Sequence, residues 1–201
     1  MRRLIDDLLT YATARDAAIS PVAVELQALT AEVVAERTAH LRNPTDGQVA
    51  LFPDVYTGPL PTVHADPVLL RQLLDNPIGN ALKYTLPGQR ARIDISAHHR
   101  PGDTHARIQI ADRGIGIPAA DQAKVFDTFH RSAAHTRNCA GTGLGLAICK
   151  KIAERHDGSI RAADNPGGGT RILLTLPTGA PVGESPDTTE PARPQNAPHR
   201  A

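Results

Sequence analysis

The sequence predicts an α/β fold in the form of a two-layer sandwich, with one helical layer over a mixed, mostly antiparallel sheet. Two observations predict it. Apolar residues recur at helical spacing in four segments, at about residues 1–18, 25–41, 66–84 and 142–155. Apolar and polar residues alternate in two further pairs of segments, and a turn containing Pro and Gly joins each pair as in an antiparallel hairpin: 93–97 with 106–110, and 159–163 with 170–176.

The first segment, residues 1–18, places Leu4, Leu8 and Tyr11 on one side of a short helix. A helix of this length is marginal on its own, so it needs a partner surface, which could be a second copy of the chain. We therefore expect at most weak homodimerisation through residues 1–18. A domain boundary follows near residue 20, because the residue before Pro21 disfavours the helical conformation.

Two further helices and two short apolar pieces follow. The helix over residues 25–41 carries a buried apolar stripe. Short apolar pieces at 49–52 and 62–65 are separated by prolines, which predicts short strands near a sheet edge. Asp66 is the predicted N-cap of the following helix and Pro67 its first residue.

Composition excludes several classes of function. The chain has 201 residues with 22 Lys and Arg against 21 Asp and Glu, so its balanced charge gives no case for binding nucleic acid or an anionic membrane. Its apolar runs fall far short of the roughly 20 residues that a membrane span needs, so we expect a cytoplasmic chain without membrane contact. The only cysteines, Cys139 and Cys149, form no CxxC motif, which excludes a disulfide scaffold.

Four patches contain residue types that a core does not need. In the helix over 66–84, Asn76, Asn80 and Lys83 share one face, and amide oxygens suit a hydrated Mg²⁺ that also binds phosphates. The alternative is an ordinary polar face of a surface helix. The second patch, DRGIG at 112–116, follows a predicted strand and offers the Asp112 carboxylate as an acceptor for an exocyclic amine.

The other two patches are rich in glycine. GTGLGLAI at 141–148 opens a helix, where free backbone N–H groups and the helix dipole attract phosphate. It lacks the GK[ST] of a Walker loop. GGGT at 167–170 alone is compatible with a simple hairpin turn. Taken singly, each of the four patches fits a structural role.

In their order and spacing, the patches resemble the motifs of the catalytic and ATP-binding domain of sensor histidine kinases, in the superfamily that also holds gyrase, Hsp90 and MutL ATPases. LLDNPIGNALKYT is similar to the asparagine box, DRGIGIP, GTGLGLAI and GGGT to the three glycine boxes, and KVFDTFHR to the phenylalanine box. RLIDDLLTYA resembles the end of the second helix of the family's dimerisation and phosphotransfer domain. The resemblance implies the Bergerat ATP-binding fold, with residues 1–20 as the end of that helix and 21–178 as the ATP-binding catalytic domain. The proline-rich segment 179–201, with its single Val, is expected to be a disordered tail.

The resemblance implies ATP and Mg²⁺ as cofactors. Asn80 and Asn76 would hold Mg²⁺, and Lys83 and Tyr84 would lie along the phosphates and the sugar. Asp112 would accept a hydrogen bond from the adenine amino group. The other nucleotide-binding residues that it implies lie in the glycine boxes: Gly114, Gly116, Ile117, Gly141, Thr142, Gly143, Leu144, Gly145, Leu146 and Thr170. The catalytic residues that it implies are Asn76, Lys83 and Arg131.

The resemblance also implies a mobile lid between Phe126 and Gly141, in which Arg131 neutralises charge on the γ-phosphate. We expect Phe126 and Phe129 to anchor this lid by burial rather than to touch nucleotide. We expect Cys149 to be a packing residue of the following helix.

The sequence departs from the family in two respects. It has no motif like HELRTP, so the phosphoacceptor histidine is expected on a partner chain or on a preceding segment, with a response regulator receiving the group next. Pro77 stands inside the asparagine-box helix, where it removes the N–H bond to the Leu73 carbonyl at a cost of about 3 kcal/mol in an ordinary helix. A kink between Asn76 and Asn80 would misalign the metal ligands.

The leading hypothesis is a histidine-kinase catalytic domain that transfers the γ-phosphoryl group of Mg·ATP to a histidine outside this chain. One alternative is a conformational ATPase like gyrase or Hsp90, although Asn76 occupies the position of its glutamate base. The other is a docking module that has lost nucleotide binding, as Pro77 would allow. If Met1 is a natural start, the chain is a split kinase; otherwise it is a fragment of a larger, membrane-bound sensor. The sequence names neither the stimulus nor the response regulator.

Overall fold

The computed structural model describes residues 18–42, 51–130 and 142–179. The expected N-terminal helix, most of the lid and the tail lie outside these ranges. The elements, in chain order, are β1 (Val22–Glu25), α2 (Leu26–Thr38), η1 (Ala39–Arg42), β2 (Asp54–Thr57), β3 (Thr62–Ala65), α3 (Pro67–Lys83), β4 (Arg92–His98), β5 (His105–Asp112), η2 (Lys124–Phe126), α5 (Gly145–Arg155), β6 (Ser159–Asp164) and β7 (Thr170–Pro177). Among the helices in these ranges, none has the length and apolar character needed to cross a bilayer.

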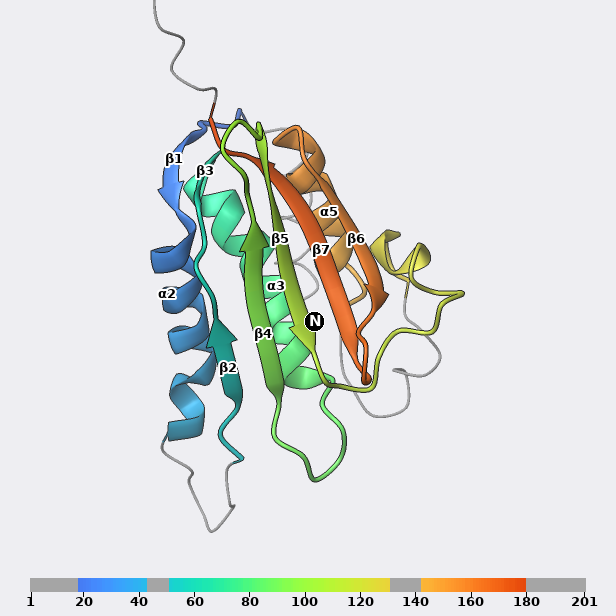
Figure 1. Cartoon of the computed structure of the whole chain (residues 1–201). Helices are drawn as coiled ribbons and strands as arrows, with labels where there is room; N and C mark the ends of the chain where they lie inside the picture. The colour runs from blue at the N-terminus through green and yellow to red at the C-terminus, as the bar shows by residue number, and fades with distance from the viewer. Residues whose placement is uncertain (1–17, 43–50, 131–141, 180–201) are drawn as a thin grey trace, which may run out of the picture.

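Five strands form the main sheet in the order β2-β4-β5-β7-β6. The pairs β4–β5, β5–β7 and β6–β7 are antiparallel, and β2 pairs with β4 in parallel. Strands β1 and β3 form a separate two-stranded antiparallel sheet. Figure 1 shows α3 and α5 on one face of the five-stranded sheet, with α2 near the β2 edge. This arrangement confirms the predicted two-layer sandwich with a mixed, mostly antiparallel sheet.

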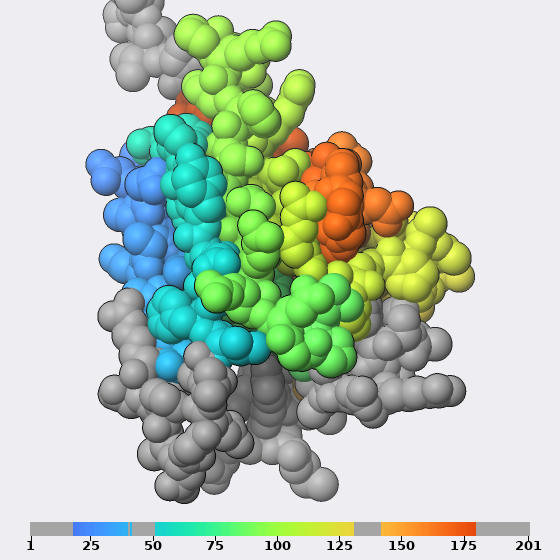
Figure 2. Space-filling view, turned by 60° about the horizontal axis from the view of Figure 1, so that its bottom comes forward, coloured from blue at the N-terminus to red at the C-terminus, as the bar shows by residue number. Residues whose placement is uncertain are grey.

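The core fills the space between the helices and the sheet. Alternate residues of β4 and β5 are buried, as the period-2 pattern predicts for strands with one covered face. The opposite face carries exposed side chains. Figure 1 shows no helix on that side of the sheet in the described part of the chain, and Figure 2 shows side chains of the teal and green strands at the surface. The principal core residues of α3, β4, β5 and α5 are Leu70, Leu73, Leu74, Ile78, Ile93, Ile95, Ile108, Ile110, Ile148 and Ile152.

Two elements differ from the predictions. The strand expected at 49–52 is wrong for Leu51 and Phe52, which are exposed and precede the true edge strand, β2. β2 pairs in parallel with β4, and β3 and α3 separate the two strands in the sequence. Because its partner is so distant, no local sequence pattern marks where β2 begins. The last helix begins at Gly145 rather than at residue 142, because Gly143 adopts a left-handed φ of 74° that no α-helix accommodates.

Helix α3 begins as predicted. The Asp66 carboxylate accepts hydrogen bonds from the backbone N–H groups of Val68 (3.0 Å) and Leu69 (3.1 Å), and Pro67 is the first helical residue. Desolvation of the Asp66 carboxylate raises its pKa. The hydrogen bonds from the backbone N–H groups of Leu69, Ser20 and Val68 outweigh that effect and hold the pKa below its ordinary value. The cap therefore carries a carboxylate at neutral pH.

Pro77 does not end α3. The helix runs from Pro67 to Lys83 through the proline, whose side chain is buried. Asn76 and Asn80 therefore remain one helical turn apart.

Candidate functional site

The predicted patches meet at one end of the five-stranded sheet. The segment after β5 contacts the end of α3, since the Ile115 N–H donates to the Tyr84 carbonyl at 3.0 Å. The start of β7 contacts the end of β5, since the Thr170 N–H donates to the Asp112 carboxylate at 3.1 Å. Residues separated by up to 86 positions are thus brought to one place by the topology.

Asp112 is the last residue of β5 and the centre of this cluster. Its Oδ1 accepts the Gly114 N–H at 2.8 Å as well as the Thr170 N–H. Hydrogen bonds from backbone N–H groups to a carboxylate are strong, so they fix its orientation. A carboxylate held in this way can accept a hydrogen bond from an amine on a planar ligand.

Two glycines are required by close contacts between backbone segments. A Cβ at Gly114 would lie 2.2 Å from the Tyr84 carbonyl oxygen, and a Cβ at Gly169 would lie 2.1 Å from the Asp112 carbonyl oxygen. Neither position has room for a side chain. The glycines of the first and third boxes therefore let α3 and the β6–β7 hairpin approach the Asp112 segment directly.

The second glycine box lies at the start of α5. The Phe129 N–H donates to the Gly143 carbonyl at 3.1 Å, and Leu144 is buried. A Cβ at Gly145 would lie 2.8 Å from Asn76 Oδ1, so the first turn of α5 touches the polar face of α3. The N–H groups of a first helical turn have no carbonyl partners within the helix, which suits them to bind an anion.

The polar face of α3 carries the other predicted residues. Asn76, Asn80 and Lys83 are all partly buried. The Asn76 side chain donates to the Gln72 carbonyl at 3.2 Å. Lys83 Nζ donates to the Tyr84 hydroxyl at 3.2 Å and lies 4.7 Å from the centre of the Tyr84 ring. The oxygens of the two asparagines are of the type that Mg²⁺ prefers.

Asp75 points away from this face. Its two carboxylate oxygens accept hydrogen bonds from Arg37 Nε and Nη2, a bidentate pair that joins α3 to α2. This hydrogen bonding to Asp75 raises the pKa of Arg37 in spite of its partial burial. Asp75 is therefore engaged in an ion pair between helices.

The phenylalanine box matches its prediction only in part. Phe126 is buried, as expected, and packs in a small cluster with Val125 and Ile172. Phe129 is 60% exposed, so the expectation that burial anchors it is wrong. Its backbone has a left-handed φ of 62°, its N–H donates to the Gly143 carbonyl, and its side chain lies at the surface.

Other predicted residues lie around the site. Ile117 and Leu146 pack against the Phe126 cluster, and Thr142 is partly buried. Cys149 is fully buried in the core, so its expected packing role is confirmed. Arg131, Gly141 and Cys139 lie outside the described residues.

Sequence reasoning missed the contribution of Asn165. Its side chain donates to the Asp112 carbonyl at 2.7 Å, and the neighbouring Pro166 carbonyl accepts a short hydrogen bond from Arg113 Nη1 at 2.5 Å. These contacts attach the β6–β7 turn to the end of β5. An asparagine in a turn usually serves the turn itself, so only the strand order β5-β7-β6 reveals this contact.

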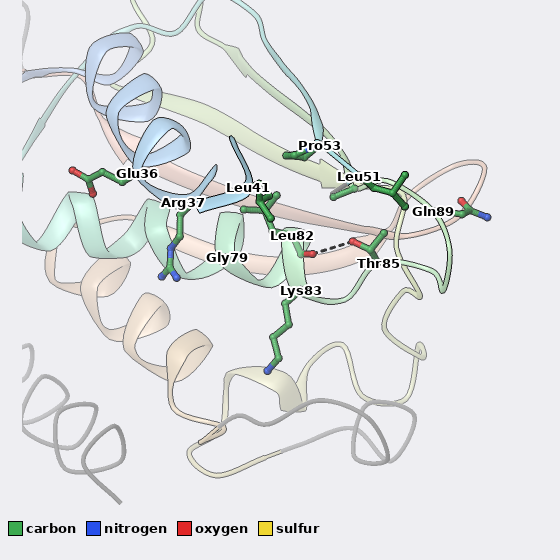
Figure 3. A pocket seen from close by; sticks show the side chains of 11 residues that line it. Glu36, Arg37, Leu41, Leu51, Pro53, Gly79, Leu82, Lys83, Thr85 and Gln89 are labelled. Atoms are coloured by element: carbon green, nitrogen blue, oxygen red, sulfur yellow. Dashed lines mark hydrogen bonds between the residues drawn. The ribbon is translucent and has the colours of Figure 1, made fainter. Parts of the chain in front are cut away.

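A cavity of about 480 Å³ lies on the α2 side of α3. It is bounded by the ends of α2 and α3 and by the segment before β2, and Lys83 is the predicted site residue on its wall. Figure 3 shows the Lys83 side chain extending away from Leu41, Leu51 and Leu82. The cavity is therefore a neighbour of the Asp112 site, on the other side of the helix.

A fixed carboxylate at a strand end, two asparagines on a neighbouring helix and a glycine-rich helix N-terminus are the features expected of a nucleotide-binding α/β domain. The chain belongs to the family of histidine kinase-, DNA gyrase B- and HSP90-like ATPases, whose family model matches residues 65–180, more than half of the chain.

Individual relatives narrow this assignment. The chain is 44% identical over 113 residues to the sensor protein kinase WalK of Staphylococcus aureus, a match that covers 56% of this chain and 27% of that protein. The structure is similar to full-length ShkA in complex with AMPPNP, with a TM-score of 0.70, 26% identity and coverage of 87% of this chain and 35% of that one. It is also similar to the mycobacterial sensor histidine kinase MprB, with a TM-score of 0.60, 26% identity and coverage of 80% and 97%. The predicted resemblance is confirmed: this is an ATP-binding catalytic domain of the sensor histidine kinase type.

Proposed function

We propose that this domain binds Mg·ATP and donates its γ-phosphoryl group to a histidine of a phosphoacceptor domain, as the catalytic step of a two-component system. The observation that carries the proposal is the Asp112 carboxylate, which the N–H groups of Gly114 and Thr170 hold near the C-terminal end of α3. Membership of the family supports it, as does the similarity to ShkA, which was solved with AMPPNP.

Asp112 would select adenine. The amino group of adenine donates a hydrogen bond to a carboxylate, whereas guanine has a carbonyl oxygen at the same ring position and would repel it. The glycine residues 114 and 116 would let the backbone pass close to the ring, with Ile117 and Thr170 beside it. The domain is therefore expected to prefer ATP to GTP.

Asn80 and Asn76 would hold Mg²⁺ through their side-chain oxygens, and the metal would neutralise charge on the phosphates. The residues present fit this role, because both asparagines lie on one face of α3 and the lack of a side chain at Gly145 accommodates Asn76 Oδ1. Lys83 and Tyr84 would lie along the phosphates and the sugar. The backbone of residues 141–146 would bind the phosphates, and Arg131 of the lid remains a predicted contact of the γ-phosphate.

In the transfer itself, the γ-phosphoryl group moves to an imidazole nitrogen and ADP leaves. The protein supplies positioning and charge neutralisation rather than a covalent intermediate. The acceptor would belong to a phosphoacceptor-histidine domain, on a separate chain or a preceding segment, and a response regulator would take the group from it. The matched segment covers only about a quarter of WalK, so these partners, and the division into 1–20, 21–178 and 179–201, are proposals.

Neither alternative function is favoured. A conformational ATPase needs a carboxylate base near the asparagines, and the nearest candidate, Asp75, is paired with Arg37 of α2. A docking module without nucleotide would be expected if Pro77 disrupted α3, but the helix continues through it.

The first test is calorimetric titration of the domain with ATP, with and without Mg²⁺. Replacing Asp112→Asn keeps an oxygen for the Gly114 and Thr170 N–H groups but turns an amide donor toward the adenine amine. We expect ATP affinity to fall by about 10- to 100-fold, the loss of a hydrogen bond to a charged group. The matched control is Asp94→Asn on the exposed face of β4, which should bind as the unaltered domain does. Equal affinity of the two variants would refute the role of Asp112.

The second test is transfer of label from [γ-³²P]ATP to a separately purified phosphoacceptor domain of a sensor kinase. We expect acid-labile, base-stable label on that protein, as for a phosphohistidine, and none when its histidine is replaced. Tight ATP binding without any transfer to several such domains would argue against the kinase function while leaving the nucleotide site intact.

A further inference from the structure

Pro77 leaves a defect in α3 that the sequence alone does not resolve. Proline has no N–H group, so the Leu73 carbonyl one turn earlier loses the donor that the helix would otherwise give it. Leu73 is fully buried, so water does not readily take the place of that donor. The carbonyl lies in the turn that leads into Asn76.

A side chain of α5 supplies a donor at this point. Cys149 Sγ lies 3.7 Å from the Leu73 carbonyl oxygen and donates its S–H group to it. Cys149 is fully buried, and its thiol also forms a hydrogen bond with the Asn76 side chain. One thiol thus contacts both the carbonyl that Pro77 deprives of its partner and one of the two proposed metal ligands.

The Cys149 thiol is held away from solvent. Burial raises the pKa of Cys149 far above its ordinary value, while the Asn76 hydrogen bond acts in the opposite direction with a smaller effect. A buried thiol of this kind is also chemically inert.

We propose that Cys149 is a positioning residue for Asn76, because its S–H group replaces the backbone donor that Pro77 removes and so holds the Asn76 turn of α3 against α5. This inference rests on the proposed Mg·ATP function of Asn76 and Asn80. Gly145, one turn before Cys149 on α5, also packs against Asn76 Oδ1. The two contacts fix the amide of Asn76 from the α5 side.

The proposal predicts that the importance of Cys149 depends on Pro77. With Pro77→Leu, an N–H group returns to the Leu73 carbonyl, and the thiol is no longer needed there. With Cys149→Ser, a hydroxyl group still donates. With Cys149→Ala, no donor remains, although the change in volume is small. A residue that only filled space would show no such dependence.

The experiment measures the affinity for ATP with and without Mg²⁺ in the unaltered domain, Cys149→Ala, Cys149→Ser, Pro77→Leu and the double variant Cys149→Ala with Pro77→Leu. We expect Cys149→Ala to weaken Mg·ATP binding by about tenfold, with metal-free ATP binding within about twofold of the unaltered domain. We expect Cys149→Ser to bind as the unaltered domain does, and Pro77→Leu to remove the effect of Cys149→Ala. Should Pro77→Leu not fold, Pro77→Ala replaces it in the same scheme.

Two outcomes overturn the proposal: a Cys149→Ala variant with unchanged Mg·ATP affinity, or a loss of the same size in both Pro77 backgrounds. Failure of the proposed metal role gives a different result, in which ATP binding by the unaltered domain does not depend on Mg²⁺. In that case the unfolding free energies of the same variants decide the positioning claim. Coupling between positions 77 and 149 would support it, and additive effects would overturn it.

Discussion

Single side chains at the ends of helices and strands fix the local geometry of this domain. Asp66 shows how one residue can act on several segments, since its carboxylate caps α3 and also accepts the Ser20 N–H at 3.2 Å. Its own N–H donates to Nε2 of the buried His156 at 2.9 Å. Asp112 has a comparable role at the other end of the domain, where two backbone N–H groups converge on one carboxylate oxygen.

The cap at Asp66 makes stability depend on pH in a defined direction. Because the pKa of Asp66 is lowered by folding, its contribution is complete above the unfolded value of about 3.9 and disappears as the pH falls through the folded value. We expect Asp66→Ala to reduce the unfolding free energy by about 1 kcal/mol at pH 7 and by less near pH 3. Urea titrations at several pH values measure both.

Asp66→Asn is the control for this prediction, because asparagine also caps helices but does not titrate. Its stability relative to Asp66→Ala should be independent of pH. An Asp66→Ala loss that stays constant between pH 7 and pH 3 would contradict the assignment of the effect to the carboxylate.

At the scale of elements, α3 is held by its two neighbouring helices. Arg37 of α2 pairs with Asp75, and Arg71 of α3 pairs with Glu32 and Glu36 of α2. On the other side, α5 contacts α3 through Gly145 and Cys149. His156, which directly follows α5, accepts the N–H of the N-cap Asp66. The helix that carries the asparagines is therefore held from its N-cap to Asn76.

The Arg37 side chain limits the space for a side chain at position 79. A Cβ at Gly79 would lie 3.2 Å from Arg37 Cζ, which is tighter than an ordinary contact. In an Arg37→Ala background we expect Gly79→Ala to stabilise the domain by about 1 kcal/mol, the difference in helix propensity. With Arg37 present the gain should be smaller or absent. Urea unfolding of the four proteins measures the difference, and an equal gain in both backgrounds would show that Arg37 does not restrict position 79.

At the scale of the whole molecule, a bound nucleotide should stabilise both layers of the sandwich. The proposed contacts come from α3, the end of β5, the start of α5 and the start of β7, so a bound nucleotide would connect elements from the helical layer and the sheet. A ligand that binds only the folded state stabilises it by mass action.

We therefore expect Mg·ATP at about 100 times its Kd to add about 2.7 kcal/mol to the stability, which corresponds to a rise of roughly 5–10 °C in Tm for a domain of this size. GTP at the same concentration should give little or no rise, because Asp112 selects the adenine amine. Differential scanning calorimetry measures both. Equal shifts with ATP and GTP would show that the base does not contact Asp112.

The sequence by itself determined the two-layer α/β sandwich, the cap at Asp66, the two hairpins and the order of the motif residues. These features depend on periodicity, capping and turn chemistry, which act over a few neighbouring residues. Tertiary structure alone decided the parallel place of β2 beside β4, the Arg37 pair with Asp75, the contact of Asn165 with Asp112, and the outward position of Phe129. It also decided the effect of Pro77, since the donor for the Leu73 carbonyl comes from Cys149, 76 residues away in the chain. The physical reason is the same in each case: the free energy of these contacts arises between segments that meet only when the sheet and helices pack.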